Sequence, residues 1–170
     1  MKNFFKTKLL FLLLFPTSPL LAKNETKTLY FIENKGQVAD FTGKVNAEIK
    51  FTAKDKGTKL FISNDGIHYQ FEKRNVLGPN DPLQITNSIS TASNSQREIV
   101  RLDMILIGAN TKATIKKEGN GNYYENYYLA HCPQGITGVQ AYTKITFQEI
   151  YPGIDWVIYS KGNQVEYDFI

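Results

Sequence analysis

Apolar and polar residues alternate in several short stretches of the chain. Residues 48–53 alternate in this way, as do residues 59–63 and 67–72, which flank the turn sequence Asn-Asp-Gly at 64–66. A period of two is typical of a β-strand with one buried face, and Asn, Asp and Gly tolerate the positive φ angles of tight hairpin turns. The pattern therefore predicts a strand followed by a β-hairpin.

Further strands are predicted in the second half of the chain. Residues 98–108 are mostly apolar on both faces, with Arg101 and Asp103 on one of them, which is typical of a strand in the middle of a sheet. Residues 112–118 are rich in lysine, which is typical of an exposed sheet edge, and residues 140–150 alternate again. Because no stretch beyond the N-terminal segment keeps a helical spacing, we expect an all-β fold, an antiparallel β-sandwich of about ten strands.

One polar stretch lies between the two halves. Residues 75–96 are rich in Asn, Ser, Thr, Gly and Pro and poor in large apolar residues. This composition predicts a long polar loop, which is either a binding loop or an ordinary surface excursion. Strand patterning resumes on both sides, so residues 23–170 are expected to form a single β-sandwich domain.

The N-terminal segment has the layout of a secretory signal peptide. Residues 1–22 comprise a basic start, an apolar run at 9–15 and a small residue, Ala22, at the expected cleavage point. The apolar run is shorter than the ~20 residues that span a bilayer, so we expect a secreted or cell-surface chain whose mature form has no transmembrane segment. Loss of the three lysines in this segment lowers the Lys and Arg count from 20 to 17, against 16 Asp and Glu, which gives no basis for nucleic-acid binding.

A second hairpin is predicted at the C-terminal end. Two alternating stretches, residues 154–159 and 164–169, flank a turn predicted at residues 161–162. This turn pairs Trp156 with Tyr167, so that one face of the hairpin is apolar.

Three carboxylates share the other face of this hairpin. The predicted register places Asp155 opposite Asp168, with Glu166 nearby. Like charges across a ladder are unfavourable and need an offset: a basic neighbour such as Lys144 or Arg101, a cation such as Ca²⁺, or a glycosidase-type use of the carboxylates. The sequence has no Asp-rich calcium loop, which favours the basic neighbour. We therefore predict no catalytic, cofactor-binding or metal-binding residue, and these three carboxylates are the only metal candidates in the sequence.

Histidine and cysteine are sparse. Cys132 is the only cysteine, so no intramolecular disulfide can form, and its neighbour His131 has no third group beside it that would make a nucleophilic site. His68 falls on the polar face of its predicted strand without a second ligand at metal spacing. Neither histidine indicates catalysis or zinc binding.

Tyrosine is concentrated in one short segment. Residues 123–128 contain four tyrosines. Aromatic rings with polar tips can form sugar-binding platforms, but tyrosine is also common in half-buried strands, so both interpretations stay open. The sequence does not identify a partner, and surface glycans and other envelope proteins are the candidates.

Four motifs resemble a known family. They resemble the N-terminal domain of large secreted bacterial proteins that are labelled gliding-motility-associated or bead-like propeller-repeat proteins. The resemblance implies a β-sandwich module of uncharacterised function at the head of a surface protein exported by type IX secretion. It implies no catalytic residues, and because family members continue beyond the position of Ile170, it also implies a truncated domain. The motifs are FIENKGQ (31–37), IKFTAK (49–54), NYYL (126–129) and YPGIDWVIYSKGNQVEYDF (151–169).

These observations lead to three functional hypotheses. The first is a non-enzymatic, exported β-sandwich module that acts as a structural or adhesive head domain without a cofactor. The second is a carbohydrate-binding module that uses Tyr123 to Tyr128. The third is a glycosidase-like hydrolase built on Asp155, Glu166 and Asp168.

Overall fold

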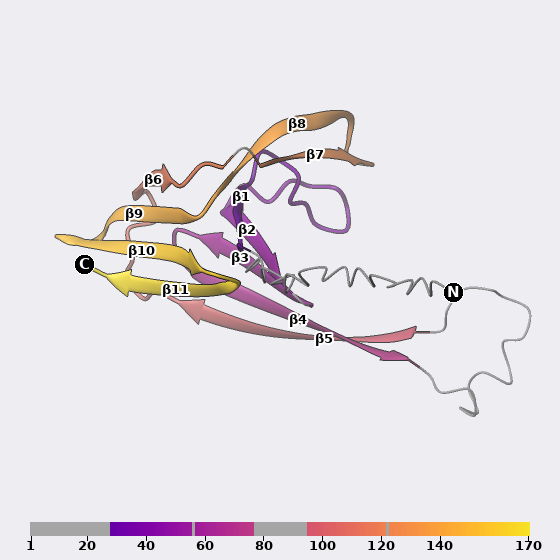
Figure 1. Ribbon diagram of the computed structural model, residues 1–170, viewed down its shortest axis with the longest axis horizontal. Helices are drawn as coiled ribbons and strands as arrows, with labels where there is room; N and C mark the ends of the chain where they lie inside the picture. The colour runs from indigo at the N-terminus through magenta and orange to yellow at the C-terminus, as the bar shows by residue number, and fades with distance from the viewer. Residues whose placement is uncertain (1–27, 56, 77–94, 122) are drawn as a thin grey trace, which may run out of the picture.

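The computed structural model describes residues 28–55, 57–76, 95–121 and 123–170. The predicted signal peptide, residues 1–22, lies outside these ranges. Within them, no helix has the length and apolar character needed to cross a membrane. The described elements are eleven strands (Figure 1): β1 (Phe31–Glu33), β2 (Ile49–Asp55), β3 (Thr58–Ser63), β4 (Gly66–Val76), β5 (Ser95–Ile105), β6 (Thr114–Glu118), β7 (Tyr124–Leu129), β8 (Cys132–Tyr142), β9 (Lys144–Tyr151), β10 (Ile154–Lys161) and β11 (Gln164–Phe169).

The strands form two antiparallel sheets. The larger sheet has the order β5-β4-β3-β2-β1-β8-β7, and the smaller has the order β11-β10-β9-β6. Only Thr143 separates β8 from β9, so one run of chain leaves the larger sheet and enters the smaller (Figure 1). The predicted all-β antiparallel sandwich is confirmed, with eleven strands in place of about ten.

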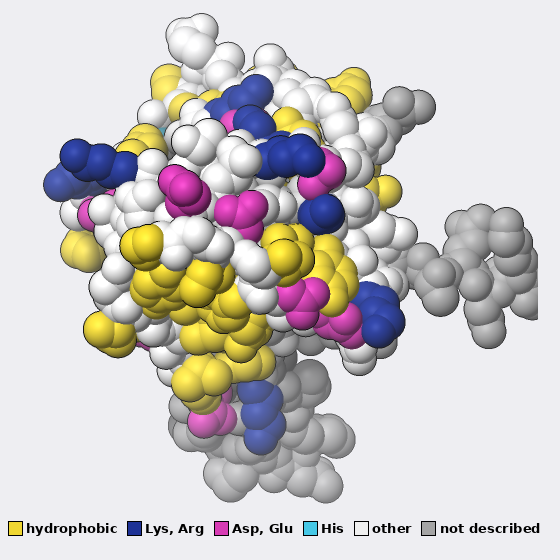
Figure 2. Space-filling view, turned by 90° about the vertical axis from the view of Figure 1, so that its left-hand side faces the viewer, with side chains coloured by type: hydrophobic (Ala, Val, Ile, Leu, Met, Phe, Trp, Pro, Cys, Tyr) yellow, Lys and Arg dark blue, Asp and Glu magenta, His cyan; other side chains and the backbone are white. Residues whose placement is uncertain are grey.

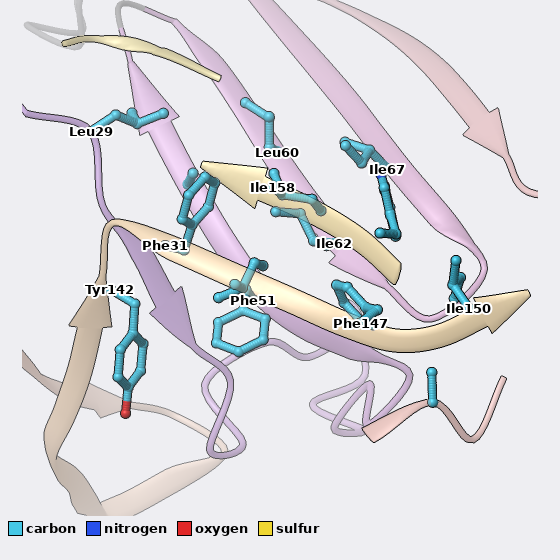
Figure 3. Close-up of a cluster of buried hydrophobic side chains, with 14 residues drawn as sticks. Leu29, Phe31, Phe51, Leu60, Ile62, Ile67, Tyr142, Phe147, Ile150 and Ile158 are labelled. Atoms are coloured by element: carbon cyan, nitrogen blue, oxygen red, sulfur yellow. The ribbon is translucent and has the colours of Figure 1, made fainter. Parts of the chain in front are cut away.

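The main hydrophobic core lies between the two sheets (Figure 3). Alternate positions of the strands supply it, so that Phe51 and Ala53 of β2 and Ile145 and Phe147 of β9 are buried as their spacing predicts. Trp156 is fully buried, and its ring centroid lies 5.1 Å from that of Phe147. Burial of this apolar surface is the dominant favourable term in folding.

The strand β5 does not lie in the middle of a sheet. It is the edge strand of the larger sheet, and Ile99, Val100 and Leu102 are 60%, 54% and 59% exposed. The prediction from its apolar composition is therefore wrong, because a strand's composition does not show which neighbours cover it. The lysine-rich β6 does lie at an edge, that of the smaller sheet, as predicted.

The predicted polar loop is shorter at both ends than its composition indicates. The strand β4 extends to Val76 and β5 begins at Ser95, and these two residues pair with each other. The ends of the stretch 75–96 are therefore strand, and residues 77–94 lie outside the described residues.

The C-terminal hairpin turns one residue later than predicted, at Gly162 and Asn163. Trp156 therefore pairs with Phe169 and not with Tyr167, so the predicted register is wrong by two residues. A shift of two keeps every side chain on its original face, since the side-chain period is also two. Tyr167 and Phe169 accordingly still lie on the same face as Trp156, with ring centroids 6.4 Å and 6.2 Å from its own.

We predict that the core depends strongly on Trp156. The substitution Trp156→Ala is expected to lower the free energy of unfolding by about 3–5 kcal/mol, because it leaves a cavity beside Phe147. Urea unfolding followed by circular dichroism measures this loss. Phe41→Ala is the matched control, since the Phe41 side chain is fully exposed and its loss should change stability by less than about 0.5 kcal/mol. Equal effects of the two substitutions would contradict the assignment of the core.

Candidate functional site

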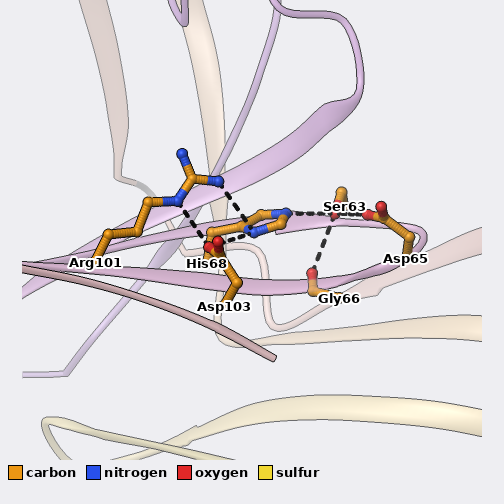
Figure 4. A network of polar contacts seen from close by, with 6 residues as sticks. All are labelled: Ser63, Asp65, Gly66, His68, Arg101 and Asp103. Carbon is orange, nitrogen blue, oxygen red and sulfur yellow. Dashed lines mark hydrogen bonds and ion pairs between the residues drawn. The ribbon is translucent and has the colours of Figure 1, made fainter. Parts of the chain in front are cut away.

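A polar network crosses three neighbouring strands of the larger sheet (Figure 4). The register of β4 and β5 places His68 opposite Asp103, and the His68 Nδ1 atom lies 2.8 Å from the Asp103 Oδ1 atom. The Arg101 Nε–H donates to the same carboxylate oxygen over 2.8 Å. Ser63, at the end of β3, has its Oγ atom 3.4 Å from the His68 Nε2 atom. A serine, a histidine and an aspartate thus lie in sequence across the sheet.

This order of side chains is the one that activates a serine nucleophile, but the distances differ from those of such a site. A nucleophile and its base normally lie about 2.6–3.2 Å apart, whereas Ser63 and His68 are 3.4 Å apart. The Ser63 hydroxyl instead donates to the Asp65 carboxylate in the hairpin turn, and Ser63 is only 2% exposed. The observed bonds therefore hold the β3–β4 turn in place.

The sequence prediction placed His68 on a polar strand face without partners. The structure gives it partners, because the pairing of β4 with β5 brings Asp103 and Arg101 beside it. Asp103 lies 35 residues away in the chain, so only the register of the two strands could have indicated this contact. Beside the network is a hollow of about 310 Å³ whose lining includes Ser63, His68 and Arg101.

We predict a pH-dependent contribution from Asp103. Its hydrogen bond with Arg101, and to a smaller extent that with His68, holds the pKa of Asp103 below its ordinary value. A carboxyl whose pKa is lower in the folded state adds stability above its unfolded pKa of about 4, and this is lost as the pH falls through the folded value. Asp103→Asn should therefore be less stable than the wild type at pH 7, with a gap that closes below about pH 4. The urea midpoints of the wild type and the variant, measured from pH 7 to below about pH 4, test this prediction. A difference in stability that does not depend on pH would contradict it.

A second and larger hollow is lined in part by three tyrosines, Tyr30, Tyr123 and Tyr127. Its volume is about 880 Å³, and we call it the tyrosine groove. Alternate residues Tyr123, Glu125, Tyr127 and Leu129 line it, while Tyr124 and Tyr128 do not. The other lining residues come from the segment before β1, from β1, β2 and β3, from the loop after β1 and from the β10–β11 turn: Thr28, Leu29, Tyr30, Ile32, Gln37, Val38, Thr52, Ala53, Lys54, Asp55, Lys59 and Asn163.

Three tyrosine rings and one carboxylate define the chemistry of the tyrosine groove. Tyr30 stacks on Tyr123 with centroids 5.3 Å apart and planes 25° apart. The Tyr123 hydroxyl donates to the Glu125 Oε1 atom over 2.8 Å, and the Tyr127 hydroxyl donates to the Oε2 atom. The bond to Glu125 raises the pKa of Tyr123, and burial followed by the same carboxylate raises that of Tyr127. Both phenols therefore remain protonated, and Glu125 is held at a fixed position.

Polar groups of both kinds surround these rings. Lys54 and Lys59 supply ammonium donors, and Asp55 accepts a hydrogen bond from the Asn163 side chain over 3.4 Å. Flat aromatic faces next to fixed donors and acceptors suit a ligand that has both apolar faces and hydroxyl groups. The sequence indicated the tyrosine cluster but not the part of Tyr30, which lies just before β1, nor the role of Glu125.

The three hairpin carboxylates do not converge. The Asp155 Oδ1 atom accepts the Glu149 backbone N–H over 2.8 Å, and Glu166 pairs with Lys161 over 3.2 Å. Asp168 lies opposite Val157 and not opposite Asp155, so the predicted like-charge pair is wrong. Within the described residues, no group of three or more His, Cys, Asp or Glu side chains has an arrangement that could hold a metal ion.

The basic residues expected to offset these carboxylates are engaged elsewhere. Lys144 pairs with Glu118 over 3.1 Å, and Arg101 pairs with Asp103. Hydrogen bonding with Asp168, and to a smaller extent with Glu166, raises the pKa of Tyr159 to about 12. Lys161 therefore offsets the charge of Glu166 alone, and the uncharged Tyr159 phenol is a hydrogen-bond partner of Glu166 and Asp168, so the face stays acidic.

The pair His131 and Cys132 is divided between different environments. The His131 Nε2 atom lies 2.9 Å from the Gly36 carbonyl oxygen, which joins the β7–β8 turn to the loop after β1. Cys132 is half-buried at the start of β8. This contact gives His131 a role in holding the loop.

Together these features define an all-β domain of two unequal antiparallel sheets, with a polar network and a tyrosine groove on the larger sheet. The chain belongs to the family described as "Domain of unknown function (DUF7948)", which matches residues 31–170. The match includes all four motifs on which the resemblance rests. No curated protein matches the chain, and no solved structure does.

Proposed function

We propose that this chain is an exported, non-enzymatic module of the adhesive type that binds a glycan in the tyrosine groove. The observation that carries the proposal is the groove itself, in which stacked tyrosines stand beside a carboxylate held by two phenols. Its volume of about 880 Å³ suits a small-molecule ligand, for which pockets of roughly 300–1,000 Å³ are usual.

The rings in the groove are suited to the apolar face of a sugar. Tyr123 is 47% exposed, and Tyr30 holds it in place by stacking on one of its faces. A sugar that stacks on a ring held in this way loses little affinity to ordering of the side chain. Glu125, Lys54 and Lys59 then offer hydrogen bonds to hydroxyl groups at the rim.

Export is proposed from the sequence of residues 1–22, whose layout is that of a signal peptide. The resemblance to head domains of secreted, gliding-motility-associated or propeller-repeat proteins supports a place at the cell surface. Type IX secretion is the export route that the same resemblance suggests. A glycan-binding head would serve adhesion there, because surface polymers present many copies of one sugar and weak sites gain from multivalency.

We predict that Tyr123 carries most of the aromatic contribution to binding. A glycan array on the wild type identifies the ligand, and calorimetric titration compares the variants. Tyr123→Ala should weaken binding about tenfold, because an aromatic contact of this kind contributes up to about 1.5 kcal/mol.

Tyr124→Ala is the matched control for this experiment. Tyr124 is 58% exposed and adjacent in sequence but does not line the groove, so its loss should leave affinity unchanged. Absence of any glycan signal from the wild type, or equal losses in the two variants, would contradict a glycan site in the tyrosine groove.

The non-enzymatic part of the proposal rests on Ser63, and it predicts a lack of serine reactivity. The hydroxyl of Ser63 is directed to Asp65, and the residue is nearly fully buried. A fluorophosphonate probe should therefore leave the wild type unlabelled, as it leaves the Ser63→Ala variant, under conditions that label a known serine hydrolase. Labelling that requires Ser63 would instead establish an activated nucleophile.

A further inference from the structure

The inner face of the larger sheet is uncovered beside the edge strand β11. Phe71 pairs with Val100, and Tyr69 pairs with Leu102, so these side chains share the face of the core residue Ile67. Phe71, Val100 and Leu102 are nevertheless 40%, 54% and 59% exposed. Figure 2 shows hydrophobic side chains gathered into a broad patch at the end of the molecule where β5 and β11 finish. The apolar surface thus continues beyond the smaller sheet.

The position of β11 explains this exposure. Tyr69 of β4 and Val165 of β11 both pack against the main core, and the Tyr69 and Tyr167 phenols are close enough to interact, which places β11 across the core from β4 (Figure 1). Burial raises the pKa of Tyr69, and the nearby Tyr167 phenol raises it further. The strand β5 lies one position beyond β4 in the larger sheet. One more strand beside β11, at the usual spacing of about 4.8 Å, would therefore lie across from β5 and cover this surface.

The backbone of β11 is oriented to accept such a strand. Ile170 exchanges both of its backbone hydrogen bonds with Asp155 of β10. Bonding direction alternates along an antiparallel ladder, so the N–H and C=O groups of Val165, Tyr167 and Phe169 point away from β10. Within the described residues, no strand lies on that side of β11.

The two faces of β11 differ in chemistry. Val165, Tyr167 and Phe169 share the face toward the core: Val165 packs against the core, and the other two rings contact Trp156 but are still 41% and 46% exposed. Glu166 and Asp168 lie on the opposite face and give it negative charge. A strand beside β11 would thus meet apolar surface on one face and carboxylates on the other.

We propose that the β11 edge accepts an extended segment of a partner protein as an added strand, in which large apolar residues alternate with basic residues. Its backbone pairs with Val165, Tyr167 and Phe169. Its apolar side chains cover Phe71 and Leu102, and its basic side chains lie beside the carboxylates of β11. This is strand addition to an exposed sheet edge, in which the ladder supplies affinity and alternate side chains supply specificity.

Charge excludes a second copy of this chain as the preferred occupant. Pairing of β11 with β11 of another copy would place Glu166 and Asp168 across from the same acidic residues, and like charges across a ladder are destabilising. Addition of a partner strand at the edge of β5 is disfavoured for another reason. Such a strand would extend the larger sheet and would not cover the exposed inner-face side chains Val100 and Leu102.

A fluorescent synthetic peptide with the sequence Lys-Ile-Lys-Val-Lys-Phe-Lys tests the proposal. Anisotropy should show binding about tenfold tighter than that of the same peptide with Glu at every Lys position, because two or three cross-strand charge pairs change sign. The variant Asp168→Lys should narrow or reverse this preference, whereas the reversal Glu48→Lys, at an exposed position before β2, should leave it intact. Amide exchange measured by NMR should slow at Val165, Tyr167 and Phe169 when the basic peptide binds.

Three results would overturn the proposal. One is equal affinity for the basic and acidic peptides, which would show a non-specific apolar surface. Another is full binding by a peptide whose backbone is N-methylated at alternate positions, since such a peptide cannot complete the ladder. The third is sedimentation of the chain alone as a dimer with the same amides protected, which would make a second copy the occupant.

Discussion

The two sheets are unequal in width, and most features of the molecule follow from this constraint. In the part of the chain that the structure describes, seven strands stand opposite four, so the smaller sheet buries only part of the inner face of the larger. Trp156, Phe147 and Ile62 are fully buried where the sheets overlap. Beyond the overlap, the inner-face side chains of Val100 and Leu102 in β5 are exposed, although the composition of this strand is that of a core strand. The buried core between the sheets and the exposed apolar surface of β5 therefore both follow from the difference in width between the two sheets.

The outer face of the larger sheet is shaped by the loop between β1 and β2. Asn34 fixes this loop, since its amide group donates to the carbonyls of Asn46 and Ile49 over 2.9 Å and 2.8 Å. Its Oδ1 atom also accepts the backbone N–H groups of Gly36 and Val38. Val38 lines both the polar hollow and the tyrosine groove, so this loop is a shared wall. The polar contacts of one residue, Asn34, thus give both hollows a fixed boundary.

Local patterns predict the fold here better than they predict the site. Alternation identified the inward residues of β2 and β9 because it depends only on neighbours in the chain, and it survived the error in the C-terminal register for the same reason. The His68–Asp103 contact and the stacking of Tyr30 on Tyr123 depend on strand pairing over long separations. The sequence shows that Tyr123, Glu125 and Tyr127 share one face of their strand segment, but it does not show that this face lines a groove. The apolar composition of β5 led to a wrong prediction for the same reason. Composition describes the strand itself and does not show how wide the opposing sheet is.

The two proposed binding surfaces lie on different faces of the sandwich but share one structural element. The β10–β11 turn holds Asn163, which lines the tyrosine groove and bonds Asp55, while the Gly162 carbonyl accepts the Leu29 backbone N–H over 2.9 Å. The strand that follows this turn presents the open edge of the smaller sheet. An added strand would fix β11 on both sides and so restrict the turn that forms one wall of the groove. Because ordering at one site reduces the entropy lost at another, this shared turn gives strand addition and glycan binding a physical route to favour each other.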